Sequence, residues 1–330
     1  MLKSKSRYYY TRLDNNSRGI YNGILSAWEA RKPDPSFIAN PANTHADIPK
    51  IVKYIAFDNP GLFYVDFSRI SIVRSGANIT TQTNFLYVDR QISDMEKQLK
   101  NVISRVLVSC KFNAMEEYDK ELALHDYLVK NVSYADEGMN DKTTSVVGAL
   151  ISNSAVCEGY SKAFKLLCDH AGLSCIVVSG MAAPLNEPGA PHSWNIVKLN
   201  GVCAHVDVTW DSTTRCDSDT CYDNFNLNDE DAAKDHSWDM SLLPACTSSQ
   251  NNYFFRNGLC VGNRSEFKKY FAARVKRGEK TIEVRLTGRE RTLEQVMSAV
   301  RETLLEIRRF GYSTSIRYSQ KRGAVLIKLI

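Results

Sequence analysis

The sequence predicts an α+β fold in which a helix carrying a cysteine packs on an antiparallel sheet. An apolar stripe runs through the helical pattern between Ser154 and Gly172, and Cys157 falls in its first turn. Two apolar-rich runs joined by Asn200-Gly201 predict a tight type I′ hairpin. A β-α-β-β pattern near the C-terminus indicates a separate small unit. The expected parts are an N-terminal α/β region at residues 1–92, a core at residues 93–262 and the C-terminal unit at residues 263–330.

Composition indicates a globular chain without a dominant charge. Of 330 residues, 43% are hydrophobic and 24% charged, and Lys plus Arg (42) exceeds Asp plus Glu (37) by 5. This excess favours a mixed surface over a nucleic-acid partner, and no apolar run is long enough to predict membrane insertion. The first residues lack the apolar stretch of a signal peptide, which favours a cytoplasmic location. Secretion is the alternative if a leader has been removed, and the oligomeric state is left open.

The nine cysteines are an odd number, so at least one thiol is free or pairs between chains. A chain of this length does not resemble a small disulfide scaffold, and a reducing compartment is the simpler interpretation. Two pairs remain open to oxidation in a secreted protein, namely Cys216 with Cys221 and Cys246 with Cys260.

The N-terminal region is predicted to have a structural or substrate-rim role, because it holds no grouping of reactive side chains. A run of apolar residues at helical spacing ends before Pro33 and Pro35, because proline cannot continue a helix. The predicted elements are helices at residues 17–31 and 48–57 and strands at residues 62–67, 69–74 and 84–88, with a turn at residues 75–78.

The core is predicted to open with two helices between residues 93 and 131, broken near residues 110–113. His125 shares a face with Leu128 in the second of these helices, which indicates a packed core histidine rather than a catalytic one. Gly172 is expected to end the cysteine helix. The segments predicted after it are a strand at residues 174–180, a Pro/Gly-rich loop at 181–191, strands at 193–199 and 202–210, and short segments at 222–227 and 229–236.

The C-terminal unit is predicted to carry no chemistry. Its basic pairs, Arg308-Arg309 and Lys321-Arg322, are interpreted as a solvated helix end and a solvated turn rather than as nucleic-acid contacts. The predicted elements are strands at residues 281–287, 313–318 and 324–330 and a helix at residues 292–310.

Cys157 is the candidate nucleophile. Unpaired amide groups and the helix dipole favour negative charge at a helix start, and the thiolate is the reactive form of cysteine. The backbone N–H of Cys157 could also face an oxyanion formed beside the sulfur. Taken alone, a buried cysteine is more often a small core residue, so the assignment depends on the groups expected nearby.

The hairpin supplies the expected partners, His192 and Asp207. With Asn200-Gly201 as a two-residue turn, opposed residue numbers sum to 401, so that Trp194 faces Asp207 and His192 faces Thr209. His192 and Asp207 then lie on one face as diagonal neighbours, roughly 7–8 Å apart at Cα. His192 is expected to act as the base and Asp207 to orient it.

Two rival assignments remain. His205 shares the face of Asp207 and is placed opposite Ile196, and we interpret it as structural. A zinc site is the other rival chemistry, but its ligands lack the spacing of a compact zinc motif, so no metal or organic cofactor is expected. The ligands in question would be Cys216, Cys221, His236 and Cys246.

Three segments resemble the transglutaminase-like superfamily. The stretch 155–164 around Cys157 resembles its nucleophile helix, 192–195 its histidine strand and 206–211 its aspartate strand. The flanks at 125–128 and 235–239 are similar to its bacterial branch, and the resemblance spans about residues 90–262. It implies a papain-like fold with a Cys157–His192–Asp207 triad. Tyr134 is the candidate second oxyanion donor, from its position ahead of the nucleophile helix, and Trp194 and Trp210 are the candidate cleft walls.

The resemblance implies acyl transfer through a thioester from a glutamine-type carboxamide or a peptide, by hydrolysis, deamidation or cross-linking. A protein or peptide is the expected substrate. The alternative is a non-catalytic protein that binds a peptide or a cell-envelope polymer. Papain-type peptidases use a Cys-Gly-Ser-Cys context that is absent here, and the Arg-Gly-Gly-x-Cys approach of arylamine acetyltransferases is absent before Cys157.

Overall fold

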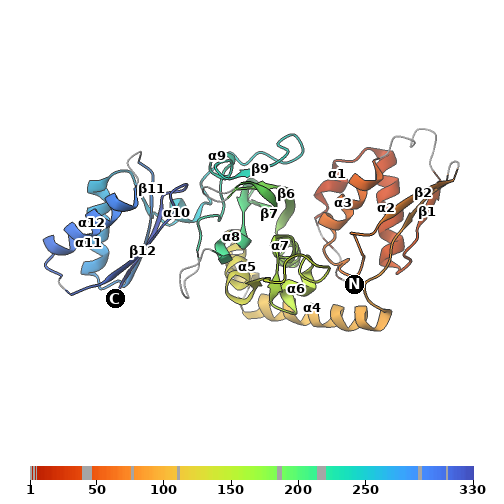
Figure 1. Cartoon of the computed structure of the whole chain (residues 1–330), viewed down its shortest axis with the longest axis horizontal. Coiled ribbons are helices and arrows are strands. Elements are labelled where there is room, and N and C mark those ends of the chain that lie inside the picture. Colours follow the sequence, from red (N-terminus) through yellow and green to blue (C-terminus); the bar gives the residue numbers. More distant parts are fainter. Residues whose placement is uncertain are drawn as a thin grey trace.

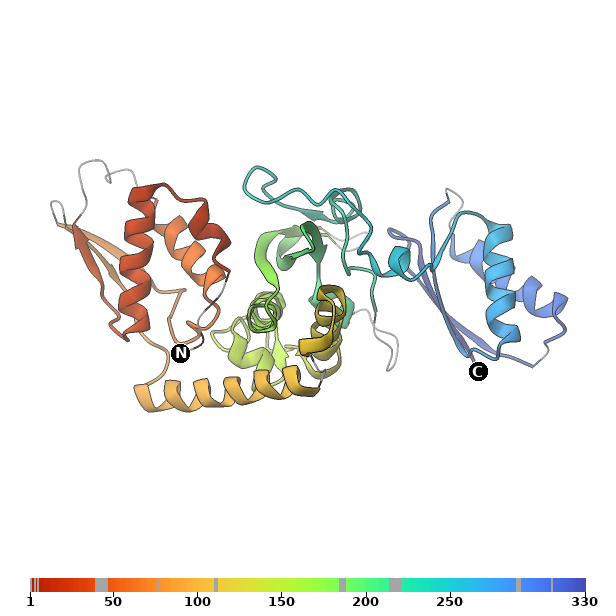
Figure 2. The ribbon, with the colours of Figure 1, turned by 180° about the vertical axis from the view of Figure 1, so that it is seen from behind.

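Three parts follow one another in space in the same order as in the sequence (Figure 1). The N-terminal part lies at one end and the C-terminal part at the other, and the view from behind shows the same row (Figure 2). This computed structural model describes residues 2, 4, 6–38, 47–75, 78–109, 112–183, 188–213, 221–288, 292–309 and 311–330. No helix within these ranges combines the length and the apolar character needed to cross a bilayer.

The N-terminal part packs helices beside a small antiparallel sheet. Asp14 accepts hydrogen bonds from the amides of Asn16 and Ser17, which is why the first long helix begins there. The predicted helices at 17–31 and 48–57 are confirmed, with small shifts at their ends. The elements are α1 (Tyr8–Thr11), α2 (Asn15–Glu29), α3 (Ile48–Asp58), β1 (Ser36–Ile38), β2 (Ser71–Ser75) and β3 (Asn78–Gln82), with strand order β1-β3-β2.

The strands predicted at residues 62–67 and 84–88 are wrong. Residues 62–67 form turns, and an isolated bridge between Val65 and Phe85 is what joins the two segments. Leu62, Phe63 and Tyr64 are all buried, so their side chains do not alternate between a core face and a solvent face. A continuous apolar run has no period that separates a strand from a buried turn. The strand predicted at residues 69–74 is displaced to β2.

The central part begins with the two predicted helices, α4 (Asp89–Ser109) and α5 (Glu117–Asn131), separated by a 3-10 turn at Phe112–Ala114. Cys110, at the predicted break, lies outside the described residues. The short elements β4 (Ser133–Tyr134), α6 (Val146–Leu150) and β5 (Ser154–Ala155) follow. The cysteine helix α7 (Cys157–Ala171) is confirmed and ends at Gly172, whose φ of 83° suits glycine.

A four-stranded antiparallel sheet carries α7. Its order is β8-β7-β6-β9, from β6 (Ser174–Ala182), β7 (Ala190–Leu199), β8 (Val202–Val206) and β9 (His236–Ser237). The predicted hairpin register is confirmed from Leu199↔Val202 to Asn195↔Val206. The predicted loop at 181–191 is shorter than expected, because β6 and β7 pair as far as Ala182↔Ala190; residues 184–187 lie outside the described ranges.

The predicted strand at 202–210 is wrong beyond Val206. Asp207 instead precedes the helix α8 (Val208–Thr213), and its Oδ1 accepts the N–H of Trp210 over 3.1 Å. Aspartate is among the best helix-capping residues, and this cap ends the strand. The predicted pairs of Trp194 with Asp207 and of His192 with Thr209 therefore do not form as strand pairs.

The C-terminal part contains the predicted β-α-β-β order, as β11 (Thr281–Leu286), α12 (Leu293–Glu306), β12 (Thr314–Tyr318) and β13 (Ala324–Leu329). Two elements were not predicted, β10 (Cys260–Val261) and α11 (Arg264–Lys276). β10 joins the sheet in the order β10-β11-β13-β12, so this sheet begins before residue 263. The sheet faces the central part and α11 and α12 lie behind it (Figures 1 and 2). The short helices α9 (Asp229–Ala232) and α10 (Tyr253–Arg256) lie before this part.

The N-terminal and central parts share one apolar cluster, while the C-terminal part has its own. Tyr9 of α1 illustrates the shared cluster, because its hydroxyl donates to the main-chain oxygen of Val177 in β6 over 2.6 Å. The N-terminal part is therefore packed onto the edge of the sheet that carries α7.

Candidate active site

Cys157 is the first residue of α7 and is partly exposed. The residue before it, Val156, provides no capping side chain, and its own N–H donates to Thr143 O over 3.0 Å. The start of α7 is held tightly in place. A Cβ on Gly159 would lie 2.2 Å from Thr143 O, so only glycine fits there.

His192 and Asp207 meet directly. His192 lies in β7 opposite Gly180 of β6, and Asp207 caps α8. Nε2 of His192 lies 2.8 Å from Oδ2 of Asp207. The Cys157 side chain lies close enough to His192 to help raise the pKa of the imidazole. Because Nε2 of His192 faces Asp207, Nδ1 is the ring nitrogen left for the thiol. The three residues predicted as a nucleophile, base and orienting acid are thus brought together, by a helix cap rather than by the expected strand pair.

The charged groups around His192 favour the protonated form of its imidazole. Burial opposes its charge, but the attraction and hydrogen bond of Asp207, together with Cys157, raise the pKa of His192 to about 10. Burial alone would raise the pKa of Asp207, yet His192 and His236 hold it below its usual value. At neutral pH the site therefore contains an imidazolium beside the thiol and an ionised carboxylate behind it.

His236 belongs to this site, although the sequence indicates it only as a candidate zinc ligand and does not place it beside Asp207. Its Nε2 lies 3.2 Å from Oδ2 of Asp207, the oxygen that also contacts His192, and its Nδ1 lies 2.6 Å from Oδ1 of Asp235. The available signal was the Asp235-His236 pair in the flank at 235–239, which the sequence places far from the hairpin.

The interpretation of Lys321-Arg322 as a solvated turn is wrong for Arg322. This side chain is 3% exposed and ion-pairs with Asp235 of the central part. A buried guanidinium is tolerated only when a carboxylate accepts its N–H groups, and here Asp235 does so. Arg309, at the end of α12, is exposed as predicted.

Trp194 and Trp210 flank the His192 ring, at centroid distances of 6.1 and 5.5 Å. Trp194 is buried, and its indole N–H donates to Nδ1 of His205 over 3.0 Å. His205 lies opposite Ile196 as predicted, and its Nε2 donates to Asp229 over 2.9 Å. It accepts at Nδ1, so it is neutral, and burial lowers its pKa. These contacts support the structural role predicted for His205.

Tyr134 lies beside the nucleophile turn. It pairs with Ala155 in the short parallel bridge between β4 and β5, and the residue is 46% exposed. Burial and the nearby Cys157 raise the pKa of its hydroxyl, which keeps the donor proton in place. Its role as a second oxyanion donor stays a prediction.

His125 is buried, as predicted for a core residue, but it is charged. Burial opposes the charge, and hydrogen bonds to Asp126 and Asp211 raise its pKa to about 9. Nε2 of His125 lies 3.1 Å from Asp211, the carboxylate that also receives the N–H of Asn224 over 3.0 Å. This network holds α5 against α8 and so supports the helix that Asp207 caps.

Two groups of residues have possible metal-ligand atoms close together. Hydrogen bonds among these atoms account for the closeness in both groups. The groups are His192, Asp207 and His236, and His205, Asp229 and Cys246, with donor atoms within 4.8 Å of one another. In each group the histidine nitrogens contact the carboxylate directly. The zinc ligands considered from the sequence do not form either group; Cys216 lies outside the described residues. Cys246 and Cys260 are free thiols.

Residues 107–210 match the family described as the transglutaminase-like superfamily, and Cys157, His192 and Asp207 all lie within this match. The chain contains a transglutaminase-like core. No curated protein matches the sequence. The match does not reach Asp235, His236 or the C-terminal part.

Solved structures similar to the chain include a transglutaminase, described as "a TGase", with 14% identity and a TM-score of 0.33 over 47% of this chain and 47% of that one. A protein from Cytophaga hutchinsonii described as a candidate cysteine protease has 16% identity and a TM-score of 0.29 over 43% of this chain and 61% of its own. The transglutaminase-like core accounts for part of the chain. The chain spans about half the length of the first of these two structures.

Proposed function

We propose that the transglutaminase-like core performs acyl transfer through a thioester on Cys157. The observation that carries this proposal is the 2.8 Å contact of His192 with Asp207, together with a Cys157 side chain close enough to His192 to affect its pKa. A thiol at a helix start, an imidazolium beside it and a carboxylate behind it are the groups that cysteine-based acyl transfer requires. The thiol comes from α7, the imidazole from β7 and the carboxylate from the start of α8.

The proposed reaction has two halves. The Cys157 thiolate attacks the carbonyl carbon of a glutamine-type carboxamide or a peptide bond and forms a C–S bond. As the C–N bond breaks, Nδ1 of His192 gives its proton to the leaving ammonia or amine, which leaves a thioester. Water or an acceptor amine then loses a proton to His192 and attacks, and the C–S bond breaks. Asp207 holds His192 throughout, and the Cys157 N–H and the Tyr134 hydroxyl stabilise the oxyanion.

A groove between the N-terminal and central parts supports a protein or peptide substrate. Its volume is about 440 Å³, and it reaches α7 at Glu158, the residue after Cys157. Phe63 and Phe67 line its N-terminal side, while Ser145 and Lys162 line its core side. An apolar and polar lining of this kind suits an extended side chain with an amide end, which supports the substrate-rim role expected for the N-terminal region.

Ammonia release and amine incorporation test the proposal. A glutamine-containing peptide is supplied with and without a primary amine, and both products are followed. We expect wild type to release ammonia or to cleave the peptide, and Cys157→Ala to do neither while keeping the wild-type melting temperature, because the change removes the sulfur but little volume. Turnover in Cys157→Ala would contradict the mechanism. A wild type that binds the peptide without turnover would favour the non-catalytic binding alternative.

A further inference from the structure

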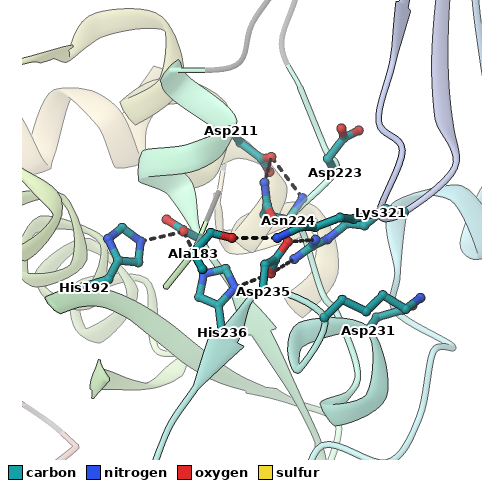
Figure 3. Close-up of polar contacts among 12 residues, drawn as sticks. Ala183, His192, Asp211, Asp223, Asn224, Asp231, Asp235, His236 and Lys321 are labelled. Carbon is teal, nitrogen blue, oxygen red and sulfur yellow. Dashed lines mark hydrogen bonds and ion pairs between the residues drawn. The ribbon is translucent and has the colours of Figure 1, made fainter. Parts of the chain in front are cut away.

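The turn between β12 and β13 reaches from the C-terminal part into the core (Figure 3). Lys321 donates from Nζ to the main-chain oxygen of Ala183 over 2.6 Å, directly after β6. Arg322 donates from Nη2 to Oδ1 of Asp235 over 2.8 Å, and its Nη1 contacts the other oxygen of the same carboxylate. Such two-point contacts fix the orientation of the carboxylate as well as its charge.

Asp235 connects Arg322 to the proposed triad by way of His236. Its Oδ1 lies 2.6 Å from Nδ1 of His236, and Nε2 of His236 lies 3.2 Å from Oδ2 of Asp207. Both carboxylates have lowered pKa values despite burial, so both are ionised near neutral pH and only accept hydrogen bonds. His236 therefore donates from both nitrogens. Figure 3 shows His192, Asp235 and His236 in this arrangement.

We propose that Arg322, Asp235 and His236 are positioning residues for Asp207, so that docking of the C-terminal part completes the active site of the transglutaminase-like core. This inference rests on the proposed function of Cys157, His192 and Asp207. None of the three positioning residues touches the thiol. They act by holding Oδ2 of Asp207 where it meets His192.

Hydrogen-bond donors and anionic acceptors alternate along this chain of contacts, which explains why its outer end matters. Arg322 donates to anionic Asp235, His236 lies between Asp235 and anionic Asp207, and Asp207 in turn contacts His192. Burial opposes the charge of Asp235, and the hydrogen bonds of Arg322 and then His236 lower its pKa to about 2. Without Arg322, Asp235 would take up a proton at a higher pH, and Nδ1 of His236 would lose its anionic acceptor.

Two other ion pairs join the same two parts and provide controls, one of them buried and the other half-buried. Arg317 contacts Asp223 over 3.0 Å, and Arg285 contacts Asp231 over 2.5 Å. Both arginines come from strands of the C-terminal part, and neither carboxylate contacts His236 or Asp207 in the described part of the chain. Each substitution breaks one ion pair between the two parts, while only the Arg322 pair is connected to Asp207.

Three elements place titratable groups near His192 and a fourth adds one close to the same site, so all of these groups contribute to a pH profile. Cys157 faces it from α7, Asp207 from the start of α8 and His236 from β9, with ring centroids 5.7 Å apart for the two histidines. Tyr134 of β4 lies close enough to Cys157 and Asp207 for its pKa to respond to both. Only Asp207 and His236 are connected to Arg322 by hydrogen bonds.

The first test is the pH profile of Cys157 alkylation by iodoacetamide in the full chain, from about pH 4 to about pH 8. In Arg322→Gln we expect the acid limb to move up by about one pH unit or more. Arg322→Lys, which keeps the charge, should restore part of the shift, and Arg317→Gln and Arg285→Gln should follow wild type. An Arg322→Gln profile equal to those of the two controls would overturn the proposal.

The second test does not depend on the chemistry of Cys157. In protein labelled with ¹⁵N-histidine, proton NMR follows the N–H signals of His236. We expect these signals to remain protected from exchange with water at about pH 5 in wild type and Arg317→Gln and to be lost in Arg322→Gln. Equal signals in the two variants would overturn the positioning role. If alkylation in wild type proves independent of His192, the proposed function fails, and this second test still decides the inference.

Discussion

His236 donates a hydrogen bond from Nε2 to Oδ2 of Asp207 over 3.2 Å. The same oxygen lies 2.8 Å from His192, while the other oxygen of Asp207 accepts the N–H of Trp210 at the start of α8. One carboxylate thus holds two imidazoles and caps a helix. A carboxylate with so many partners cannot rotate freely, which keeps the His192 ring in one orientation.

Asp207→Asn should impair the proposed reaction severely. The amide carries no charge, so we expect the pKa of His192 to fall from about 10 towards its ordinary value of 6.5 and turnover to drop by roughly 10²-fold or more. NMR titration of His192 measures the first effect and a steady-state assay the second. Asp229→Asn is the matched control, because it removes the carboxylate of the His205 pair. Unchanged turnover in Asp207→Asn would remove Asp207 from the mechanism.

Gly159→Ala should displace the start of α7. The new Cβ would lie 2.2 Å from Thr143 O and 2.9 Å from the Cβ of Ala155, so the backbone must shift. We expect a loss of about 1–3 kcal/mol in the free energy of unfolding and slower alkylation of Cys157. Gly23→Ala, in α2 with open space around it, should be neutral or slightly stabilising. Equal stability of the two variants would show that the contact at Gly159 is not tight.

We expect the buried carboxyl group of Glu121 to lower the stability of the folded protein at alkaline pH. It is fully buried in α5, and Oε1 has no partner among the described residues, while Oε2 accepts from Asn226 over 2.6 Å. Burial raises its pKa from the ordinary 4.5 to about 8, which the Asn226 hydrogen bond and His125 only partly oppose. The folded state therefore holds this proton more tightly than the unfolded state. Its contribution to stability is complete below pH 4.5 and is lost as the pH rises through 8.

Glu121→Gln should remove this contribution, because an amide does not titrate. We expect the free energy of unfolding of wild type to fall by on the order of 3 kcal/mol between about pH 5 and about pH 9. The variant should show a shallower fall, since His125 still contributes in the same direction. Denaturant melts at several pH values measure both. Glu137→Gln, on an exposed turn, should follow wild type; an equal slope in Glu121→Gln would place the proton elsewhere.

Local signals explain which elements were predictable. The apolar stripe and Gly172 define α7, and Asn200-Gly201 defines the turn whose register is observed from Leu199↔Val202 to Asn195↔Val206. These features depend on residues within one turn or one hairpin, where periodicity and backbone preference are strong. The register brings β8 alongside β7 as far as Val206, which places Asp207 near His192, although the contact itself depends on the cap of α8.

Features that depend on distant partners were not predictable. Asp207 ends its strand because its side chain caps α8, and an aspartate among Val206, Val208 and Thr209 fits a β pattern equally well in sequence. Arg322 occurs in a Lys-Arg-Gly turn that reads as solvated, yet its partner Asp235 lies 87 residues away. No local rule links those two positions, so neither the buried ion pair nor the place of His236 beside Asp207 could be inferred.

The rate of Cys157 alkylation by iodoacetamide as a function of pH, in wild type and His192→Ala, tests the central claim most directly. Mass spectrometry reads each cysteine separately, so Cys203 and Cys260, which are also partly exposed, are internal references whose pKa values burial raises. We predict that Cys157 reacts well below the free-thiol pKa of about 8.5 and that His192→Ala removes this advantage. A Cys157 that reacts no faster than Cys203 and Cys260, and does not respond to His192→Ala, would contradict the thiolate–imidazolium pair and the enzyme with it.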